Sequence, residues 1–382
     1  MISHRASQIP PFIVMDVLEK AQAMERRGEH VIHLEVGEPD FDTPECIKEA
    51  CWRAIRDGHT HYTHSLGLLE LREAICEHYH NTYGVTITPD RVVITSGTSP
   101  AMFLLFSALL EKGDEVIISD PRYACYPNFI RFFEGLPVSV KVFEEEGFQY
   151  SAGEIRKKIS VRTKAIMINS PSNPTGNILT SERMKEIASL DIPVISDEIY
   201  HGLVYEDREH TILEFSDRAF VFNGFSKAYA MTGWRLGYLI APPEFVRPIQ
   251  KIQQNLFISA NSFVQHAGVA ALREAGPDVE RMRNIFNERR HYITDRLGRL
   301  GLGIAVKPTG AFYILANIKH FSNDSYSTAF DILKNAKVGV TPGIDFGENC
   351  EGYLRLSYAN SLENITEGLD RIETYLRERG LV

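Results

Sequence analysis

The sequence predicts an α/β fold, with a large domain built on a mostly parallel sheet flanked by helices and a smaller α+β domain. Between residues 91 and 240, short apolar runs alternate with segments of helical period, a pattern typical of mostly parallel sheets. After Pro277 the pattern changes to a long helix followed by shorter strands and helices. The chain has 382 residues, which is more than one hydrophobic core usually organises.

Six apolar runs in the first region are predicted to be buried strands because Gly, Pro or Asp residues bound them. In chain order they are RVVIT, EVIIS, KAIMIN, PVISD, AFVFNG and RLGYLIA. Helical patterns such as AMFLLFSALLEKG and SERMKEIASL lie between them. Because this alternation is typical of parallel strands joined by helices, we expect helices on both faces of the sheet.

The region after Pro277 predicts a second, smaller domain. Its segments are, in order, the helix DVERMRNIFNERRHYITDRLGRLG, the strand AFYILANI, a helix at AFDILKNA, the strand GYLRLSYA and the helix ENITEGLDRIETYLRERG. Segment 1–44 is rich in proline and loop residues and is expected to pack with this region. We therefore expect a large domain at 45–285 and a small domain made of 1–44 and 286–382.

The composition excludes several classes of protein. Apolar residues make up 44% and charged residues 24%, which is ordinary for a soluble globular chain. The net charge of −9, without a long Lys/Arg run, argues against nucleic acid or an anionic membrane as a partner. Membrane-spanning and signal-peptide patterns are missing, and the five cysteines lack a C-x-x-C pair. We expect a cytoplasmic protein without disulfides.

The motif NGFSKAYAMTGWRLGY at 223–238 contains the first candidate for chemistry. Lys227 follows an apolar strand in a turn flanked by Gly and Ser, where open α/β sheets place their ligands. A lysine there can bond covalently to a carbonyl carbon if its surroundings lower its pKa. Ser226 and Arg235 are suited to bind a phosphate, the arginine through two hydrogen bonds. Taken alone, a lysine at a strand end is most often a surface residue.

Two further motifs follow strands of the same sheet. Asp197 ends the strand of VISDEIY, where its carboxylate suits a protonated pyridine nitrogen; the alternative is a helix N-cap. Asn173, in NSPSNPTG, and Tyr200 are placed to donate to one phenolate oxygen of such a ring. The alternative for NSPSNPTG is a plain turn.

The segment ITSGTSPAM joins a strand to a helix. Ser99 is expected to be the N-cap and Pro100 the first helical residue. The backbone N–H groups of Gly97 and Thr98 would then lie at the positive end of the helix and form an anion site. A glycine-containing turn of this kind is common, so the motif alone is weak.

Taken together, these motifs resemble fold-type I pyridoxal 5′-phosphate (PLP) enzymes, and most closely the class I/II aminotransferase family, including bacterial aspartate and aromatic aminotransferases. The similarity runs from HLEVGEPDFDTP (33–44) through THYTHSLGLLELREAI (60–75) to GYLRLSYAN (352–360). It implies a PLP-dependent aminotransferase that moves an amino group from an L-α-amino acid to a 2-oxo acid such as 2-oxoglutarate by a ping-pong mechanism. It also implies a homodimer with shared active sites.

The resemblance assigns roles to individual residues. Lys227 would hold PLP covalently and carry the proton, Asp197 would pair with the ring nitrogen, and Asn173 and Tyr200 would bind the ring oxygen. The phosphate would be held by Gly97, Thr98, Ser226, Arg235 and, from the partner subunit, Tyr62. Tyr123 would stack on the cofactor ring. Arg355 would bind the substrate α-carboxylate with the backbone of Gly37, and Asn173 would also contact the substrate. For Arg355 the alternative is an ordinary strand salt bridge.

Other interpretations compete with this one. The spacing of His59, His61 and His64 suggests a metal site, but no carboxylate or cysteine lies at suitable local spacing, so we expect none. A PLP-dependent β-lyase, or a related amino-acid lyase, would share almost every residue above. A PLP-sensing regulator would need a DNA-binding domain, for which there is no room before HLEVGEPD.

The substrate is left open. Bacterial aspartate aminotransferases that resemble this chain have a lysine where Ser99 stands, so aspartate is doubtful as a substrate. Arg122 and a residue of the partner subunit are the candidates to compensate.

Overall fold

The computed structural model describes residues 2–381 and contains a seven-stranded sheet with the order β2-β8-β7-β6-β5-β3-β4. The strands are β2 Val92–Thr95, β3 Glu115–Asp120, β4 Leu136–Lys141, β5 Thr163–Asn169, β6 Val194–Asp197, β7 Phe220–Gly224 and β8 Gly237–Ile240. Only β8 runs antiparallel to its neighbours; the other pairs are parallel. The mostly parallel sheet and all six expected strands are confirmed. The additional strand, β4, lies at the sheet edge and is largely exposed, so it lacks a continuous apolar run.

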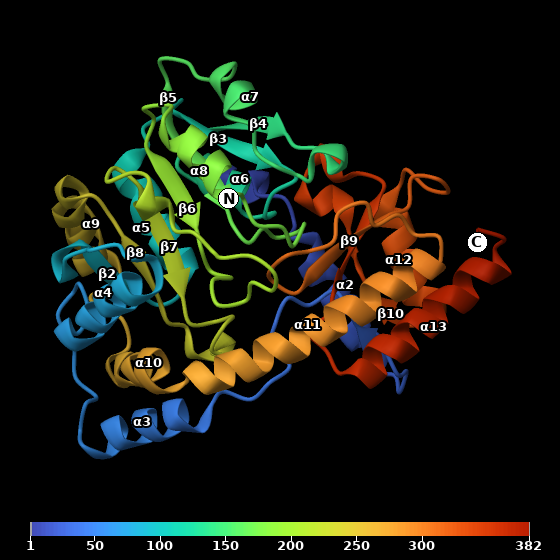
Figure 1. Cartoon of the computed structure of the whole chain (residues 1–382), viewed down its shortest axis with the longest axis horizontal. Helices are drawn as coiled ribbons and strands as arrows, with labels where there is room; N and C mark the ends of the chain where they lie inside the picture. The colour runs from blue at the N-terminus through green and yellow to red at the C-terminus, as the bar shows by residue number, and fades with distance from the viewer. Residues whose placement is uncertain (1, 382) are drawn as a thin grey trace.

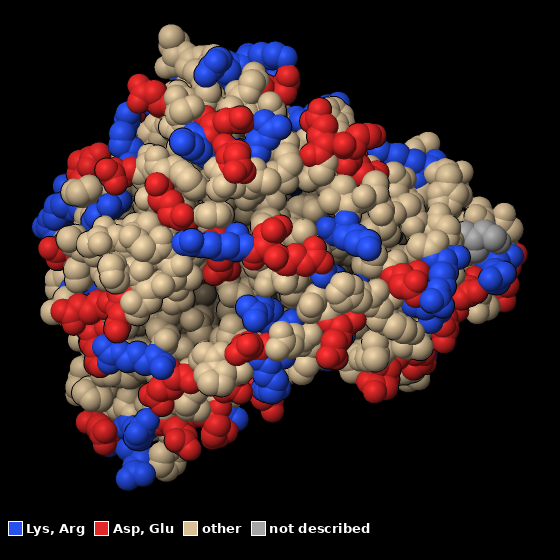
Figure 2. All heavy atoms as spheres, in the orientation of Figure 1, with Lys and Arg blue, Asp and Glu red and all other residues tan. Residues whose placement is uncertain are grey.

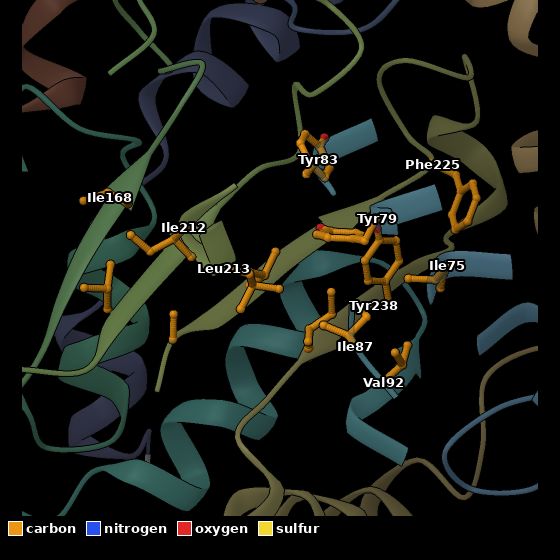
Figure 3. Packing of buried hydrophobic residues seen from close by; sticks show 14 of the residues in the cluster. Ile75, Tyr79, Tyr83, Ile87, Val92, Ile168, Ile212, Leu213, Phe225 and Tyr238 are labelled. Carbon is orange, nitrogen blue, oxygen red and sulfur yellow. The ribbon is translucent and has the colours of Figure 1, made fainter. Parts of the chain in front are cut away.

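Helices cover both faces of this sheet (Figure 1). They are α4 Leu69–Tyr83, α8 Ser181–Ala188 and α10 Ser262–Glu274 on one face and α5 Thr98–Leu109, α6 Tyr126–Phe132 and α9 Pro243–Leu256 on the other. Each face of the sheet has its own hydrophobic core, the first under α4, α8 and α10 and the second under α5, α6 and α9. Along β5, Ile166 belongs to the first core and Met167 to the second, because side chains alternate along a strand. In the first core, Figure 3 shows the rings of Tyr79 and Tyr238 lying together.

The C-terminal region forms its own sheet and core. Strands β11 Thr341–Pro342, β12 Tyr353–Ser357 and β9 Tyr313–Asn317 are antiparallel in that order. The expected helices are α11 Gly276–Arg299, α12 Ser325–Ala336 and α13 Leu362–Glu378. Figure 1 shows α11 running from the region below the large sheet toward α12 and α13. Helix α11 passes continuously across residue 285, where we predicted the domain boundary. That boundary stays a prediction.

The N-terminal segment contains two helices, α1 His4–Gln8 and α2 Ile13–Glu25, where we expected loops. Val17, Ala21 and Met24 of α2 are buried against Leu333 of α12. Strand β1 Ile32–His33 pairs in parallel with β10 Val338–Gly339. The N-terminal segment therefore contacts the C-terminal region through both a helix and a strand.

The other helical segments connect these elements. They are α3 Glu45–Arg56, α7 Ala152–Arg156 and the 3₁₀ helices η1 Pro89–Arg91, η2 Glu144–Glu146, η3 Ile212–Glu214, η4 Thr232–Trp234, η5 Gly343–Phe346 and η6 Glu348–Cys350. Within residues 2–381, no helix is long and apolar enough to cross a membrane.

Candidate active site

The ends of the strands of the large sheet and residues of the C-terminal region enclose one cavity of about 270 Å³. Strands β5, β6 and β7 run parallel, so the residues that come after them meet at the same edge of the sheet. Arg355 reaches the cavity from β12. The predicted site residues that line it are Gly37, Thr98, Tyr123, Asn173, Asp197, Tyr200, Ser226, Lys227, Arg235 and Arg355.

The amine of Lys227 contacts Gly37, another residue that lines this cavity. Its Nζ donates a hydrogen bond to the carbonyl oxygen of Gly37 at 2.6 Å. Burial lowers the pKa of Lys227 to about 8; Glu38 opposes this shift. An amine with such a pKa is partly unprotonated near neutral pH, and it can therefore act as a nucleophile or carry a proton.

Asp197 is almost fully buried at the end of β6. Its Oδ2 accepts a hydrogen bond from the hydroxyl of Tyr126 at 2.7 Å, and its Oδ1 accepts one from the backbone N–H of Ile199 at 3.2 Å. Burial raises the pKa of Asp197 to about 6, although the bond from Tyr126 lowers it. The bond to Ile199 resembles the capping alternative, but a turn and not a helix comes after Asp197. No pattern in the sequence pointed to Tyr126, because its partner lies 71 residues away.

We expect Tyr126→Phe to raise the pKa of Asp197 further, because the lost hydrogen bond favours the carboxylate. A hydrogen bond to a charged group contributes about 1.5–3 kcal/mol, or roughly one to two pKa units. If Asp197 works as the carboxylate, the acidic limb of the profile of kcat/KM against pH should move upward by about one unit. An acidic limb that stays in place would show that Tyr126 does not set the charge of Asp197.

The start of α5 has the geometry of an anion site. Gly97 precedes the helix with φ 95°, and a β-carbon there would lie 2.5 Å from Nη2 of Arg235. Arg235 Nη1 donates to the carbonyl oxygen of Thr232 at 2.9 Å. A guanidinium and the first N–H groups of a twelve-residue helix therefore lie side by side.

The expected N-cap at Ser99 was wrong. The helix begins at Thr98, so the cap is Gly97, and Ser99 and Pro100 lie in the first turn. The positive φ of Gly97, which glycine adopts without steric cost, turns the chain into the helix earlier than a Ser cap would.

Arg355 is buried and forms no ion pair within residues 2–381, and hydrogen bonds hold its guanidinium in place. Its Nη1 donates to Oδ1 of Asn173 at 3.0 Å, and its Nη2 donates to Oγ1 of Thr341 at 3.1 Å and to the carbonyl oxygen of Glu35. The guanidinium lies 4.4 Å from the ring centre of Tyr313. Among the described residues, nothing forms a hydrogen bond with its buried Nε. Within the described part of the chain, Arg355 therefore does not form the ordinary strand salt bridge that was its alternative role.

Tyr313 is a second residue that the sequence did not indicate. Its hydroxyl lies 2.9 Å from the hydroxyl of Tyr200, and a β-carbon on Gly37 would overlap with it. Tyr313 therefore contacts three predicted site residues at once, namely Tyr200, Gly37 and Arg355. Only the pairing of β9 with β12 brings it there.

Two predicted site residues, Tyr62 and Gly97, do not themselves line this cavity. Tyr62 is 82% exposed and does not line the cavity of its own chain. Tyr123 does line it, and its ring packs edge-on against Phe12 and Tyr126.

The ring of His59 lies 4.3 Å from that of His266, and Nδ1 of His64 accepts from the backbone of Leu66. In the described part of the chain, no cluster of His, Cys, Asp or Glu is arranged to hold a metal ion.

Several proteins that are similar to this chain in sequence and fold are named as transaminases. The family model "Aminotransferase class I and II" matches residues 29–372. A (5-formylfuran-3-yl)methyl phosphate transaminase of Methanocaldococcus jannaschii is 43% identical over 99% of this chain and 100% of its own. Aromatic-amino-acid aminotransferase 2 of Thermococcus litoralis is 38% identical over the full length of both chains. The structure of Thermus thermophilus aspartate aminotransferase with maleate superimposes with a TM-score of 0.94 at 38% identity, covering 98% of this chain and 99% of that one.

These comparisons confirm the fold type and the family that the motifs indicated. Members of this family depend on PLP and act on amino acids and 2-oxo acids, with the two substrates reacting in turn. The three similar proteins carry names with three different substrates, so the family alone does not identify the substrate of this chain. The chain belongs to the class I and II aminotransferase family and is a PLP-dependent transaminase.

Proposed function

We propose that the cavity at the strand ends binds PLP, with Lys227 as the residue of covalent attachment. The observation that carries this proposal is the position of Lys227, a lysine of lowered pKa in one cavity with a buried carboxylate and an anion site. The close approach of Arg235 to Gly97 leaves no room for a side chain and suits a phosphate. Ser226 and Thr98 also line this cavity.

The cofactor, when bound, supplies an electron sink for the negative charge that develops at the substrate Cα. Asp197 would keep the proton on the ring nitrogen. The amide oxygen of Asn173 is occupied by Arg355, which leaves its amide nitrogen to donate to the ring oxygen together with Tyr200. Arg355 and the backbone of Gly37 would hold the substrate carboxylate, so that the Cα–H bond faces Lys227. The Lys227 amine would then take the proton from Cα and return it to carbon C4′.

A spectroscopic test separates the transaminase from its alternatives. Addition of 2-oxoglutarate to the pyridoxamine form should restore the visible absorbance and release one glutamate per site. A β-lyase would instead release ammonia from an amino acid with a leaving group on its β-carbon. A binding protein would do neither.

We also propose that two copies form a homodimer in which Tyr62 of the partner subunit donates to the cofactor phosphate. The support is that this tyrosine is 82% exposed in the single chain, in a loop just before α4.

The division into domains at 45–285 and at 1–44 with 286–382 stays a prediction, as does a cytoplasmic location. Figure 2 shows acidic and basic side chains intermixed on the face in view, without the broad basic area that nucleic acid favours.

Complementation should reveal the shared sites. Tyr62→Phe removes one charge-assisted hydrogen bond of about 1.5–3 kcal/mol, so PLP should bind about ten- to a hundredfold more weakly. Arg355→Ala homodimers should be nearly inactive. Mixing the two variants should regenerate one intact site per heterodimer, because Arg355 and Lys227 come from the same chain. Activity is measured against the mixing ratio, with light scattering to report the dimer; activity no greater than the sum of the two homodimers would contradict shared sites.

A further inference from the structure

We infer that the substrate end of this cavity accepts a large apolar or aromatic amino-acid side chain, and that Asp345 positions the helix that forms this apolar wall. This inference rests on the proposed function, because it takes Arg355 as the residue that binds the α-carboxylate.

The N-terminal segment supplies the apolar wall. Phe12, Val14, Met15 and Leu18, at the start of α2, line the cavity. Met102 of α5, Val36 and Ile199 are further apolar residues of the lining. The adjacent face of α2, with Val17, is buried against α12, so the helix is anchored beside the face that lines the cavity. An apolar surface of this kind is stabilised by apolar groups that cover it.

The charges in the cavity do not suit a second substrate carboxylate. Within residues 2–381, the charged residues that line it are Asp197, Lys227, Arg235 and Arg355. All of them have roles in the proposed function. A side-chain carboxylate at the apolar wall would lose its hydration without meeting a free cation of the same chain.

Two nearby residues do not provide that cation. Arg122, a candidate to bind a substrate carboxylate, pairs with Asp120 at 3.4 Å and does not line the cavity. Ser99 lines the cavity, but its side chain is neutral.

Asp345, in η5, fixes the start of α2. The helix has no side-chain cap of its own at Phe12. Asp345 replaces that cap, because its Oδ1 and Oδ2 accept from the backbone N–H groups of Ile13 and Val14, each at 3.2 Å. A carboxylate at a helix N-terminus also interacts favourably with the helix dipole. Asp345 therefore determines where the apolar residues of α2 lie relative to the cavity, without touching the substrate.

The test compares two unreactive carboxylates that differ only at the far end, 3-phenylpropionate and succinate. With the PLP-loaded enzyme, calorimetric titration should give at least about tenfold tighter binding of 3-phenylpropionate. In single-turnover reactions, phenylalanine and leucine should react at least about a hundredfold faster than aspartate at equal low concentration. Tighter binding of succinate, or a faster reaction of aspartate, overturns the inference.

Two variants locate the effect. Leu18→Arg should weaken 3-phenylpropionate binding and strengthen succinate binding, whereas Gln22→Arg, one turn further along α2 and exposed, should change neither. Asp345→Asn should raise the KM for phenylalanine about tenfold with a smaller change in kcat, and its Tm shows whether it folds. Equal effects of the two arginine substitutions, or an unchanged KM in Asp345→Asn, overturn the role given to α2 or to Asp345.

Failure of the proposed function gives a different result. If borohydride fixes no cofactor to Lys227, the cofactor site itself is wrong, whichever carboxylate binds. If the cofactor is fixed to Lys227 and succinate binds more tightly, only the substrate class is wrong.

Discussion

Lys227→Ala is expected to abolish turnover, with kcat lowered by at least about 10⁴-fold, since both the covalent attachment and the proton carrier are lost. PLP should still bind noncovalently, because the anion site at Gly97 and Arg235 does not involve the lysine. The purified protein should be yellow, and borohydride followed by mass spectrometry should locate the adduct on Lys227. Lys251→Ala, an exposed lysine on α9, is the matched control and should retain both adduct and activity. An adduct on any other lysine would remove Lys227 from this role.

The lowered pKa of Lys227 adds a pH dependence to this prediction. The unprotonated amine attacks, and its fraction rises as the pH passes through the pKa of about 8. The rate at which the cofactor-free enzyme takes up PLP should therefore increase from pH 7 to pH 9 and then level off. A rate that keeps rising up to pH 10.5 would indicate a lysine with an ordinary pKa.

Asp197→Asn is expected to lower the proton-transfer rate by about a thousandfold, because the neutral amide no longer holds the proton on the ring nitrogen. Cofactor affinity should fall much less than the rate. The substitution separates the two interpretations of this residue, since the asparagine oxygen can still accept from the backbone of Ile199 and preserve the turn. Near-normal turnover in a variant with an unchanged Tm would show that Asp197 only holds the turn.

The sequence could predict many residues that line the candidate site, because several of them lie at or soon after the ends of apolar strands. Asp197 ends β6, and Lys227 comes three residues after the end of β7. In a parallel sheet the carboxyl ends lie at one edge, so residues near these ends share a cavity even when they are far apart in the sequence. The motifs at these strand ends were also specific enough to identify the family.

The mistakes occurred where the local pattern was weak. Strand β4 was not expected because an exposed edge strand has no apolar run. Helix α2 was not expected because its N-cap residue is Phe12 and its cap comes from Asp345, which lies 331 residues from Val14. At α5, the cap preference of serine indicated Ser99, whereas the positive φ of Gly97 starts the helix earlier.

The sequence by itself determined the α/β class, the order of the strands in the chain, the family and the residues with motif-defined positions around the cavity. Only the tertiary structure decided which side chains hold those residues in place. Tyr126 contacts Asp197 across 71 residues and Tyr313 contacts Tyr200 across 113, and both contacts depend on the packing of separate elements. A motif reflects the residues at the end of a single strand, whereas a hydrogen bond between two elements depends on how both are packed, and no local pattern contains that information.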